Sequence, residues 1–233
     1  MSDTGGNYCE LFNRYNIALE EVKNFVYQCL SRFCKDNFVN CMSSYRIKSQ
    51  ESIERKMEEK NKEIDSICDI AGIRVVFCDF SDLQDLCVLD QDIRNWEKNE
   101  FITNFYDAVG RYKNHFINTI YDFREYIRVQ SQKNDDFKVI IDEKKDYIKY
   151  PKKSGYQSIH MVISYRGVPV ELQIRNLVQH YFAEYEHKYY KDETYTRSEY
   201  NPICNECADT LNNISCDYST DSHKRKHYLK LYK

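Results

Sequence analysis

The N-terminal part of the chain carries apolar residues at helical spacing. The positions that return every three or four residues are Leu11, Tyr15, Ala18, Val22, Val26, Cys29 and Phe33. This period predicts one amphipathic helix over residues 8 to about 42, because residues three and four apart share a helix face. A second helix is expected within residues 45–60, where Ser49 can cap the first turn, Glu51 lies in that turn and a charged run follows.

Compact β-branched runs predict strands further along the chain. Residues 73–77 indicate a buried strand, and residues 137–141 and 159–165 are two more candidates. Arg166 and Gly167 can turn the chain into a strand over residues 168–174, which predicts a hairpin.

An aromatic stripe at helical spacing separates the first strand from the others. Its members are Phe101, Phe105, Val109, Tyr112, Phe116, Ile120, Phe123 and Ile127. They predict a long amphipathic helix over residues 90 to about 130, and such a stripe more often packs in a core or against a partner helix than on bases. Further helices are expected to start at 82–88, to cover 176–191 and, briefly, 208–214 before a basic tail.

Composition narrows the class of protein. With 42% hydrophobic residues, 3 Pro and 6 Gly among 233 residues, a globular protein with long helices is expected rather than a loop-rich all-β fold. Together with the strands predicted above, the expected fold class is α+β. The net charge of -3 is not that of a bulk nucleic-acid binder, although local clusters can still bind phosphate. Neither a signal peptide nor an apolar run of membrane-spanning length is found, so a cytoplasmic location without a membrane partner is expected.

The 10 cysteines are expected to be mostly free thiols in that compartment. Cys204 and Cys207 form a CxxC, followed by Cys216, His223 and His227. Their spacing is compatible with a zinc site or with ordinary free thiols, and the sequence leaves both readings open.

Two carboxylates lie where a sheet can present them. Asp69 directly precedes the first predicted strand, and a hard cation such as Mg²⁺ prefers such oxygen ligands, although an Asp here is also a common turn residue. Glu171 shares its strand face with Gln173 and Arg175, which indicates either a solvated sheet face or the floor of a site.

A lysine-rich loop covers residues 144–160. Lysines around a Gly- and Pro-containing turn suit a polyphosphate, and Tyr156 beside Gly155 can present its ring to a base. The alternative is a solvent-exposed basic turn. The segment has no P-loop motif.

The order of these pieces is more specific than any one of them. RIKSQES, DIAGIR, DYIKYPKKSGYQSIH, VELQIR and the later EHK, between residues 45 and 191, resemble the synthetase domain of the RelA/SpoT family, above all its single-domain small alarmone synthetases. The resemblance implies a nucleotidyltransferase-like fold with a mixed, mainly antiparallel sheet of about five strands, flanked by helices, with a long N-terminal helix and helical additions. It also implies transfer of the β,γ-diphosphate of ATP to the 3′-hydroxyl of GDP or GTP with release of AMP.

The resemblance further implies a role for individual residues. Asp69 and Glu171 would bind Mg²⁺, and Glu171 would also take the proton of the attacking hydroxyl. The residues implied for ATP are Arg46 and Arg74 around the adenine, and Lys48, Ser52 and Lys56 on the phosphates. The residues implied for the acceptor are Tyr156 on the guanine, Lys145, Lys152 and His160 on its phosphates, and Gln173 near the metal and the ribose.

Several positions depart from the family pattern: Ser154, Gln157, His180 and Phe182. They leave the acceptor open among GDP, GTP and GMP. The segment at about 85–135 is an insertion relative to typical small members. The expected organisation is therefore a helical segment at 1–44, a synthetase domain at 45–192 and a helical, basic tail at 193–233.

Other hypotheses keep the same motifs. Some relatives pyrophosphorylate the 3′ end of tRNA, and the basic tail could contact RNA. A third hypothesis is a degenerate, non-catalytic module that binds nucleotide or RNA. The presence of both carboxylates and both arginines argues against it. A homo-oligomer, a tetramer by resemblance, is expected. No adjacent His-Asp pair of the family's hydrolase domain exists in the chain, so synthesis without hydrolysis is expected.

Overall fold

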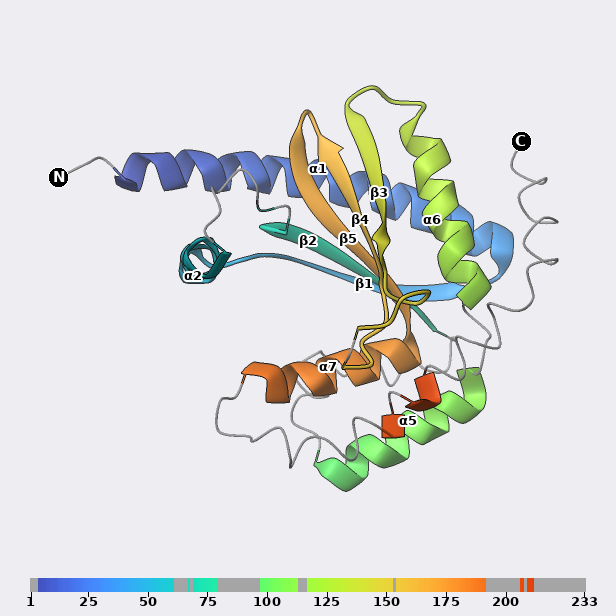
Figure 1. Cartoon of the computed structure of the whole chain (residues 1–233). Helices are drawn as coiled ribbons and strands as arrows, with labels where there is room; N and C mark the ends of the chain where they lie inside the picture. Colours follow the sequence, from blue (N-terminus) through green and yellow to red (C-terminus); the bar gives the residue numbers. More distant parts are fainter. Residues whose placement is uncertain are drawn as a thin grey trace.

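The fold is built on one five-stranded sheet, seen in the computed structural model of the chain (Figure 1). The structure describes residues 4–60, 67, 69–78, 97–112, 117–152, 154–191, 206–207 and 209–211. In spatial order the strands are β1 (Asn40–Ile47), β2 (Ala71–Cys78), β5 (Val168–Asn176), β4 (Ile159–Tyr165) and β3 (Phe137–Asp146). β2 and β5 run parallel, and the other neighbours run antiparallel. The predicted α+β class with a mixed, mainly antiparallel sheet is confirmed.

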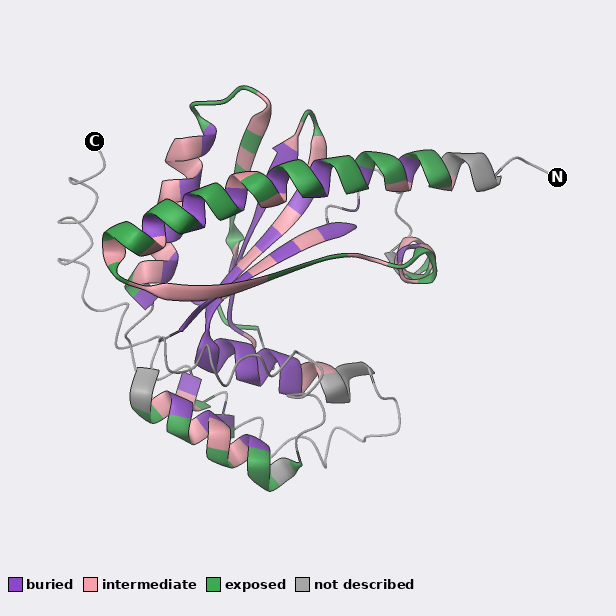
Figure 2. Ribbon diagram, turned by 180° about the vertical axis from the view of Figure 1, so that it is seen from behind, coloured by how far each residue is buried: buried purple, intermediate pink, exposed green. Residues whose placement is uncertain are grey.

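Helices cover both faces of this sheet. Their bounds are α1 (Thr4–Asn37), α2 (Gln50–Lys60), α5 (Lys98–Tyr112), α6 (Ile117–Ser131) and α7 (Leu177–Lys191). α1 and α6 pack on one face, whereas α7 packs on the other and is itself covered by α5 (Figure 1). α2 follows the edge strand β1. Figure 2 shows the buried stripe of α1 against the sheet and the buried first part of α7.

The core between α1, α6 and the sheet is aromatic. Phe33, Phe77 and Phe123 contact one another with ring centroids 5.1 to 6.0 Å apart, and all three are almost fully buried. Rings at these separations contribute beyond the area that they bury. The predicted apolar stripe of α1 is therefore a core stripe.

The predicted first helix is too long at its C-terminal end. α1 ends at Asn37, Phe38 adopts a left-handed φ of 54°, and the Val39 amide donates to the Cys34 carbonyl at 3.1 Å. This bond closes a Schellman-type cap, after which β1 begins at Asn40. β1 was missed because it is an edge strand in which every residue is half-buried or exposed, so no alternation of apolar and polar residues marks it.

The prediction of one long helix over residues 90–130 is wrong. The described part of this segment forms two helices, α5 and α6, that lie on opposite sides of the sheet (Figure 1). α5 packs on α7 and α6 packs on α1, β3 and β5. The apolar residues of both helices recur at the same helical spacing, so the pattern runs on from one helix to the next. The pattern was misleading because the two helices bury their apolar faces against different surfaces.

The remaining elements follow the sequence pattern. β2, β3, β4, β5 and α7 contain or closely match the predicted ranges. The hairpin between β4 and β5 turns at Arg166 and Gly167 with φ of 47° and 86°, the two left-handed positions of a type I′ turn. The helix start at 82–88, Cys204 and the basic tail lie outside the described residues, and of 208–214 only 209–211 is described, as helical. Among the described helices, none has the length and apolar character needed to cross a bilayer.

Candidate active site

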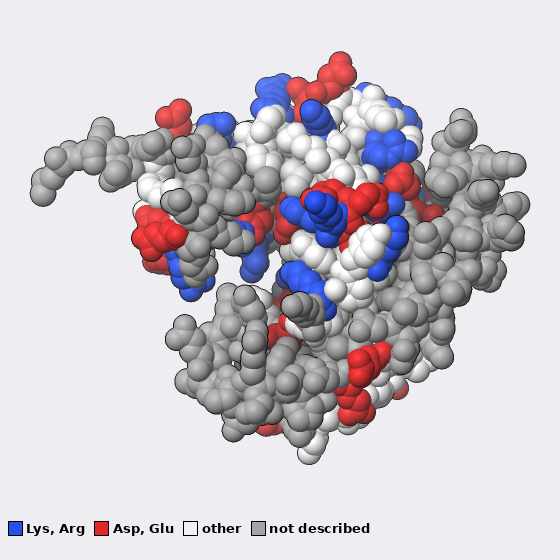
Figure 3. Space-filling model, in the orientation of Figure 1, with Lys and Arg blue, Asp and Glu red and all other residues white. Residues whose placement is uncertain are grey.

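Strand register brings the polar side chains of β1, β2, β5 and β4 to one face of the sheet. Glu171 pairs with Gly72, and Gln173 pairs with Arg74 on one side and His160 on the other. Directly paired residues share a face, and Arg74 contacts α7, so this is the face toward α7. Figure 3 shows Lys and Arg side chains around a hollow on this side of the molecule.

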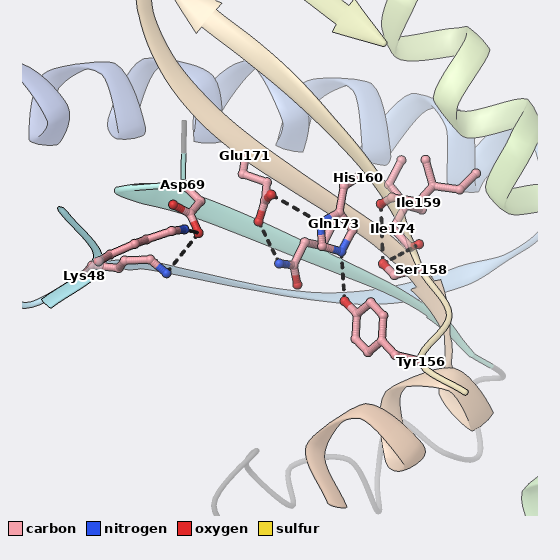
Figure 4. A network of polar contacts seen from close by, with 10 residues as sticks. Lys48, Asp69, Tyr156, Ser158, Ile159, His160, Glu171, Gln173 and Ile174 are labelled. Carbon is pink, nitrogen blue, oxygen red and sulfur yellow. Dashed lines mark hydrogen bonds and ion pairs between the residues drawn. The ribbon is translucent and has the colours of Figure 1, made fainter. Parts of the chain in front are cut away.

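The first half of the site surrounds Asp69, at the turn that leads into β2. Its Oδ2 accepts from the Lys48 ammonium at 3.2 Å and from the Lys56 ammonium at 2.5 Å (Figure 4). The Lys48 amide donates to the Ile70 carbonyl at 2.8 Å, which ties the end of β1 to this turn. Three of the residues assigned by resemblance to metal and ATP therefore lie together.

α2 holds Lys56 and Ser52 beside this cluster. Ser49 caps the helix as predicted: its Oγ accepts from the Ser52 amide at 3.4 Å, and its hydroxyl donates to the Ser52 Oγ at 3.0 Å. Ser52 and Lys56 are one turn apart and share a helix face. The Ser52 hydroxyl is engaged with the cap.

The Asp69 carboxylate is held in its ionised form. Burial alone raises its pKa, but the hydrogen bond from Lys56 and the charges of Lys48 and Lys56 outweigh burial, so the net pKa is lowered. The negative charge of Glu171 has the opposite, smaller effect and raises the pKa of Asp69, so the two carboxylates interact electrostatically.

The second half of the site is a chain of hydrogen bonds that ends on Glu171 (Figure 4). The Tyr156 hydroxyl lies 2.8 Å from His160 Nε2, and His160 Nδ1 lies 3.2 Å from Glu171 Oε1. The Gln173 amide donates to Glu171 Oε2 at 2.8 Å. A carboxylate only accepts, so Nδ1 of His160 carries the proton toward Glu171, and Nε2 can accept from Tyr156.

Glu171 has a strongly lowered pKa. Burial raises it, but the hydrogen bond and charge of His160, the Gln173 hydrogen bond and the charge of Lys145 together lower the pKa to about 2. A base with so low a pKa is a weak proton acceptor near neutral pH. This environment suits a permanently ionised ligand for a cation better than a general base.

The loop before β4 presents Tyr156. Gly155 has a left-handed φ of 89° and its amide donates to the Lys152 carbonyl at 2.8 Å, while the Lys152 amide donates to the Tyr156 carbonyl at 3.2 Å. The Lys152 ammonium lies over the Tyr156 and Tyr147 rings, 4.5 and 4.7 Å from their centroids. The described part of the predicted lysine-rich loop therefore contains a turn at Gly155 and places the Lys152 cation on an aromatic pair.

Asp69 keeps one carboxylate oxygen that can serve as a ligand for a hard cation. Asp69 Oδ1 is buried and makes no hydrogen bond, so one carboxylate oxygen has a lone pair available for a cation. Within the described part of the chain no three His, Cys, Asp or Glu side chains come together as a metal site. A cation held here would therefore have one or two protein carboxylates, a set that Mg²⁺ completes with waters and phosphate oxygens.

The two arginines assigned to adenine by resemblance are diagonal neighbours on β1 and β2. Arg46 pairs with Gly72, and Ser44 pairs with Arg74, so small residues occupy the other two corners. Diagonal pairs are about 7–8 Å apart. From these positions two long side chains can reach the two faces of one flat ring, since each contact takes about 3.5–4 Å.

Sequence reasoning missed the partners of Arg74. The Arg74 guanidinium contacts Glu184 of α7, and Glu184 also binds Arg175 at the end of β5. The sequence did show that Arg175 shares a strand face with Glu171, which placed Arg175 near the site. No sequence pattern linked Arg175 to Glu184, nine positions later on a helix. Of the family departures, Gln157, His180 and Phe182 are buried.

A family model for the "Region found in RelA / SpoT proteins" matches residues 45–195, well over half of the chain. The chain belongs to the RelA/SpoT family. GTP pyrophosphokinase YwaC of Bacillus subtilis is a RelA/SpoT relative 29% identical over 161 residues, which are 63% of this chain and 56% of that protein. The chain thus spans just over half the length of this relative.

Solved structures share the fold with this RelA/SpoT protein. Small alarmone synthetase 1 from Bacillus subtilis superposes with a TM-score of 0.59 at 20% identity, over 95% of this chain and 98% of that one. Its structure bound to its product pppGpp gives a TM-score of 0.58 at 21% identity, over 93% and 98% of the two chains. At this identity the match establishes the fold.

Proposed function

We propose that this chain is a magnesium-dependent pyrophosphokinase, which moves the β,γ-diphosphate of ATP to the ribose 3′-hydroxyl of GDP or GTP and releases AMP. The observation that carries the proposal is the juxtaposition of two half-sites, a lysine–carboxylate cluster at Asp69 and a hydrogen-bonded chain ending on Glu171. Membership of the RelA/SpoT family and the GTP pyrophosphokinase name of the relative support it.

The donor nucleotide would lie along β1, α2 and β2. Arg46 and Arg74 would hold the adenine between two guanidinium planes, which an ammonium could not do. Lys48, Ser52 and Lys56 would bind the phosphates, with the lysines moving from Asp69 to the incoming oxygens. Transfer of a phosphoryl group passes through a loose transition state, so positioning and charge stabilisation supply most of the catalysis.

The acceptor would lie on the loop before β4. Tyr156 would stack on the guanine, while Lys145, Lys152 and His160 would bind its phosphates. Burial raises the pKa of Tyr156, with smaller opposing contributions, so its hydroxyl stays protonated and can donate to His160. Gln173 fixes one oxygen of Glu171 and would sit close to the ribose.

Asp69 and Glu171 would hold Mg²⁺ between the two nucleotides. The chemistry that this ion supplies when bound is neutralisation of negative charge on the phosphate oxygens. Glu171 stays ionised across the physiological range because of its low pKa. The proton of the 3′-hydroxyl needs only a weak acceptor in a loose transition state, so Glu171 can receive it late.

The proposal is tested by incubating the protein with labelled ATP, Mg²⁺ and one acceptor at a time. AMP release with GDP or GTP, together with label on the guanine nucleotide, is the expected result. Label on bulk tRNA would instead support transfer to the tRNA 3′ end. Nucleotide binding without turnover on any acceptor would contradict enzymatic function. The same assay with GMP measures whether the site also accepts a guanine nucleotide with a single phosphate.

A further inference from the structure

One carboxylate oxygen on α7 binds two arginines of the sheet. Glu184 Oε1 lies 2.8 Å from an Arg74 Nη and 2.9 Å from an Arg175 Nη. The exposed fractions of the three side chains are 15% for Arg74, 3% for Glu184 and 1% for Arg175. Neither Glu184 nor Arg175 has a part in the reaction proposed above.

A buried triad of charges contributes little net free energy to the stability of a fold. Burial removes hydration from three charges, and a buried ion pair often contributes no more than apolar residues of similar size. Here two cations share one anion, and burial together with the nearby Arg74 charge lowers the pKa of Arg175. Packing alone therefore does not account for this arrangement.

The geometry of a guanidinium offers a reason. Its N–H groups point outward in the plane of the group, so a carboxylate binds its edge, whereas a base stacks on its face. Glu184 contacts one edge nitrogen of Arg74, which leaves the faces of the guanidinium open and restrains where the group lies. Without this contact the long Arg74 side chain would have several rotamers to lose on binding a base.

The position of α7 makes the contact directional. β5 leads straight into α7, which folds back under β2 and β5 on the site face (Figure 1). Glu184 therefore meets Arg74 from below the sheet, while Gly72 and Arg46 lie beside Arg74 on the sheet itself. Arg175, at the end of β5, anchors Glu184 from the other side.

We propose that Glu184, anchored by Arg175, is a positioning residue that fixes the Arg74 guanidinium for stacking on the base of the donor nucleotide. This rests on the proposed function, in which Arg74 contacts the adenine of ATP. Glu184 touches no substrate in this scheme and acts only through Arg74.

The main test uses Glu184→Gln, which keeps the shape and an acceptor oxygen but removes the charge. Binding of the non-hydrolysable α,β-methylene analogue of ATP, measured by calorimetry with Mg²⁺, should weaken about tenfold, within the range of a cation–π contact. GDP affinity should change less than about twofold, because Glu184 contacts Arg74 and Arg175, neither of which is assigned to the acceptor. Equal weakening for both nucleotides would overturn the positioning role.

A second variant covers the risk that Glu184→Gln unfolds around Arg175. Glu184→Asp keeps the negative charge but retracts it by one methylene, so charge balance remains while the guanidinium is no longer held. If Glu184 only compensates charge, Glu184→Asp should bind the ATP analogue like the wild type, and that result overturns the proposal. A loss about equal to that of Glu184→Gln supports it.

Coupling to Arg74 is the decisive measurement. In an Arg74→Ala background, Glu184→Gln should add no further loss of ATP-analogue affinity, because a positioning residue has nothing left to position. Additive losses would overturn the proposal. Asp136→Asn, which breaks an exposed pair with Arg166 at the distant hairpin, is the control and should leave both affinities unchanged. The wild-type turnover assay decides the proposed function separately, since these readouts need only binding.

Discussion

The donor and acceptor halves of the site are built in different ways. The donor half is assembled from charges that are close in sequence: Lys48 and Lys56 flank the start of α2 and converge on Asp69, each with its side chain about one-fifth to one-quarter exposed. The acceptor half is a chain of directed hydrogen bonds from Tyr156 through His160 to Glu171, set by the register of β4 and β5.

The two halves differ in how far their side chains are free to move. Lysine ammonium groups are point charges on flexible stems, so the donor half can follow a phosphate chain that moves during transfer. An imidazole held at both nitrogens has one orientation, so the acceptor half presents a fixed frame for the attacking hydroxyl. We infer that variants of Lys48 and Lys56 will mainly change ATP binding, whereas variants of His160 will mainly change the alignment of a bound acceptor.

The largest effect is expected where both halves meet. Asp69→Asn and Glu171→Gln each keep side-chain volume but remove a proposed ligand charge, and each should lower kcat by about 10²–10³-fold or more, as for loss of a preorganised stabilising group. AMP release at saturating ATP and GDP measures this, with circular dichroism as the check on folding. Near-normal turnover in either variant would remove that residue from the proposed site.

Gly72→Ala should weaken ATP binding without changing the acceptor half of the site. A Cβ at this position meets only the Glu171 carbonyl oxygen at 3.6 Å, an ordinary contact, so the fold should accept it. The methyl would enter the space between Arg46 and Arg74, and turnover at limiting ATP should fall about 10²-fold, as for a misplacement of about 1 Å.

The matched control is Gly110→Ala on α5, where a Cβ meets nothing within 4 Å. It should keep full activity, and its melting temperature should stay the same or rise because Ala favours a helix by about 1 kcal/mol over Gly. An active Gly72→Ala enzyme would show that the space beside Arg74 is not used by the donor.

Tyr156→Ala should break the acceptor half with a smaller effect. Loss of a stacking ring costs about 1–3 kcal/mol, so KM for GDP should rise by roughly ten- to a hundredfold while KM for ATP stays within twofold. Tyr156→Phe keeps the ring and loses the hydroxyl that bonds to His160, so its KM for GDP should stay near the wild-type value. A matching rise in both KM values for the Ala variant would argue against stacking on the acceptor.

The smallest effect concerns stability against pH. The pKa of Glu171 is lowered from 4.5 to about 2, so its ionised form stabilises the folded state above pH 4.5 and this contribution is lost as the pH falls toward 2. Asp69 acts in the same direction. The urea midpoint should therefore fall less steeply in Glu171→Gln than in the wild type below pH 4.5; identical slopes would show that Glu171 is not held ionised.

Local pattern in the sequence determined most elements of the fold. The apolar period of α1, the β-branched run of β2, the Arg166–Gly167 turn and the Ser49 cap each depend on residues within a few positions of one another. Such signals survive in the sequence because adjacent residues decide them. The ordered motifs then indicated the family and the residues of both half-sites.

Tertiary structure decided the rest. The edge strand β1, the division of one helical stripe between α5 and α6, and the parallel pairing of β2 with β5 depend on contacts between distant segments. The same pairing places Glu171 beside Gly72, close to Asp69, and α7 carries Glu184 to Arg74. No local period encodes such contacts, because their energy comes from surfaces that meet only after the chain has folded.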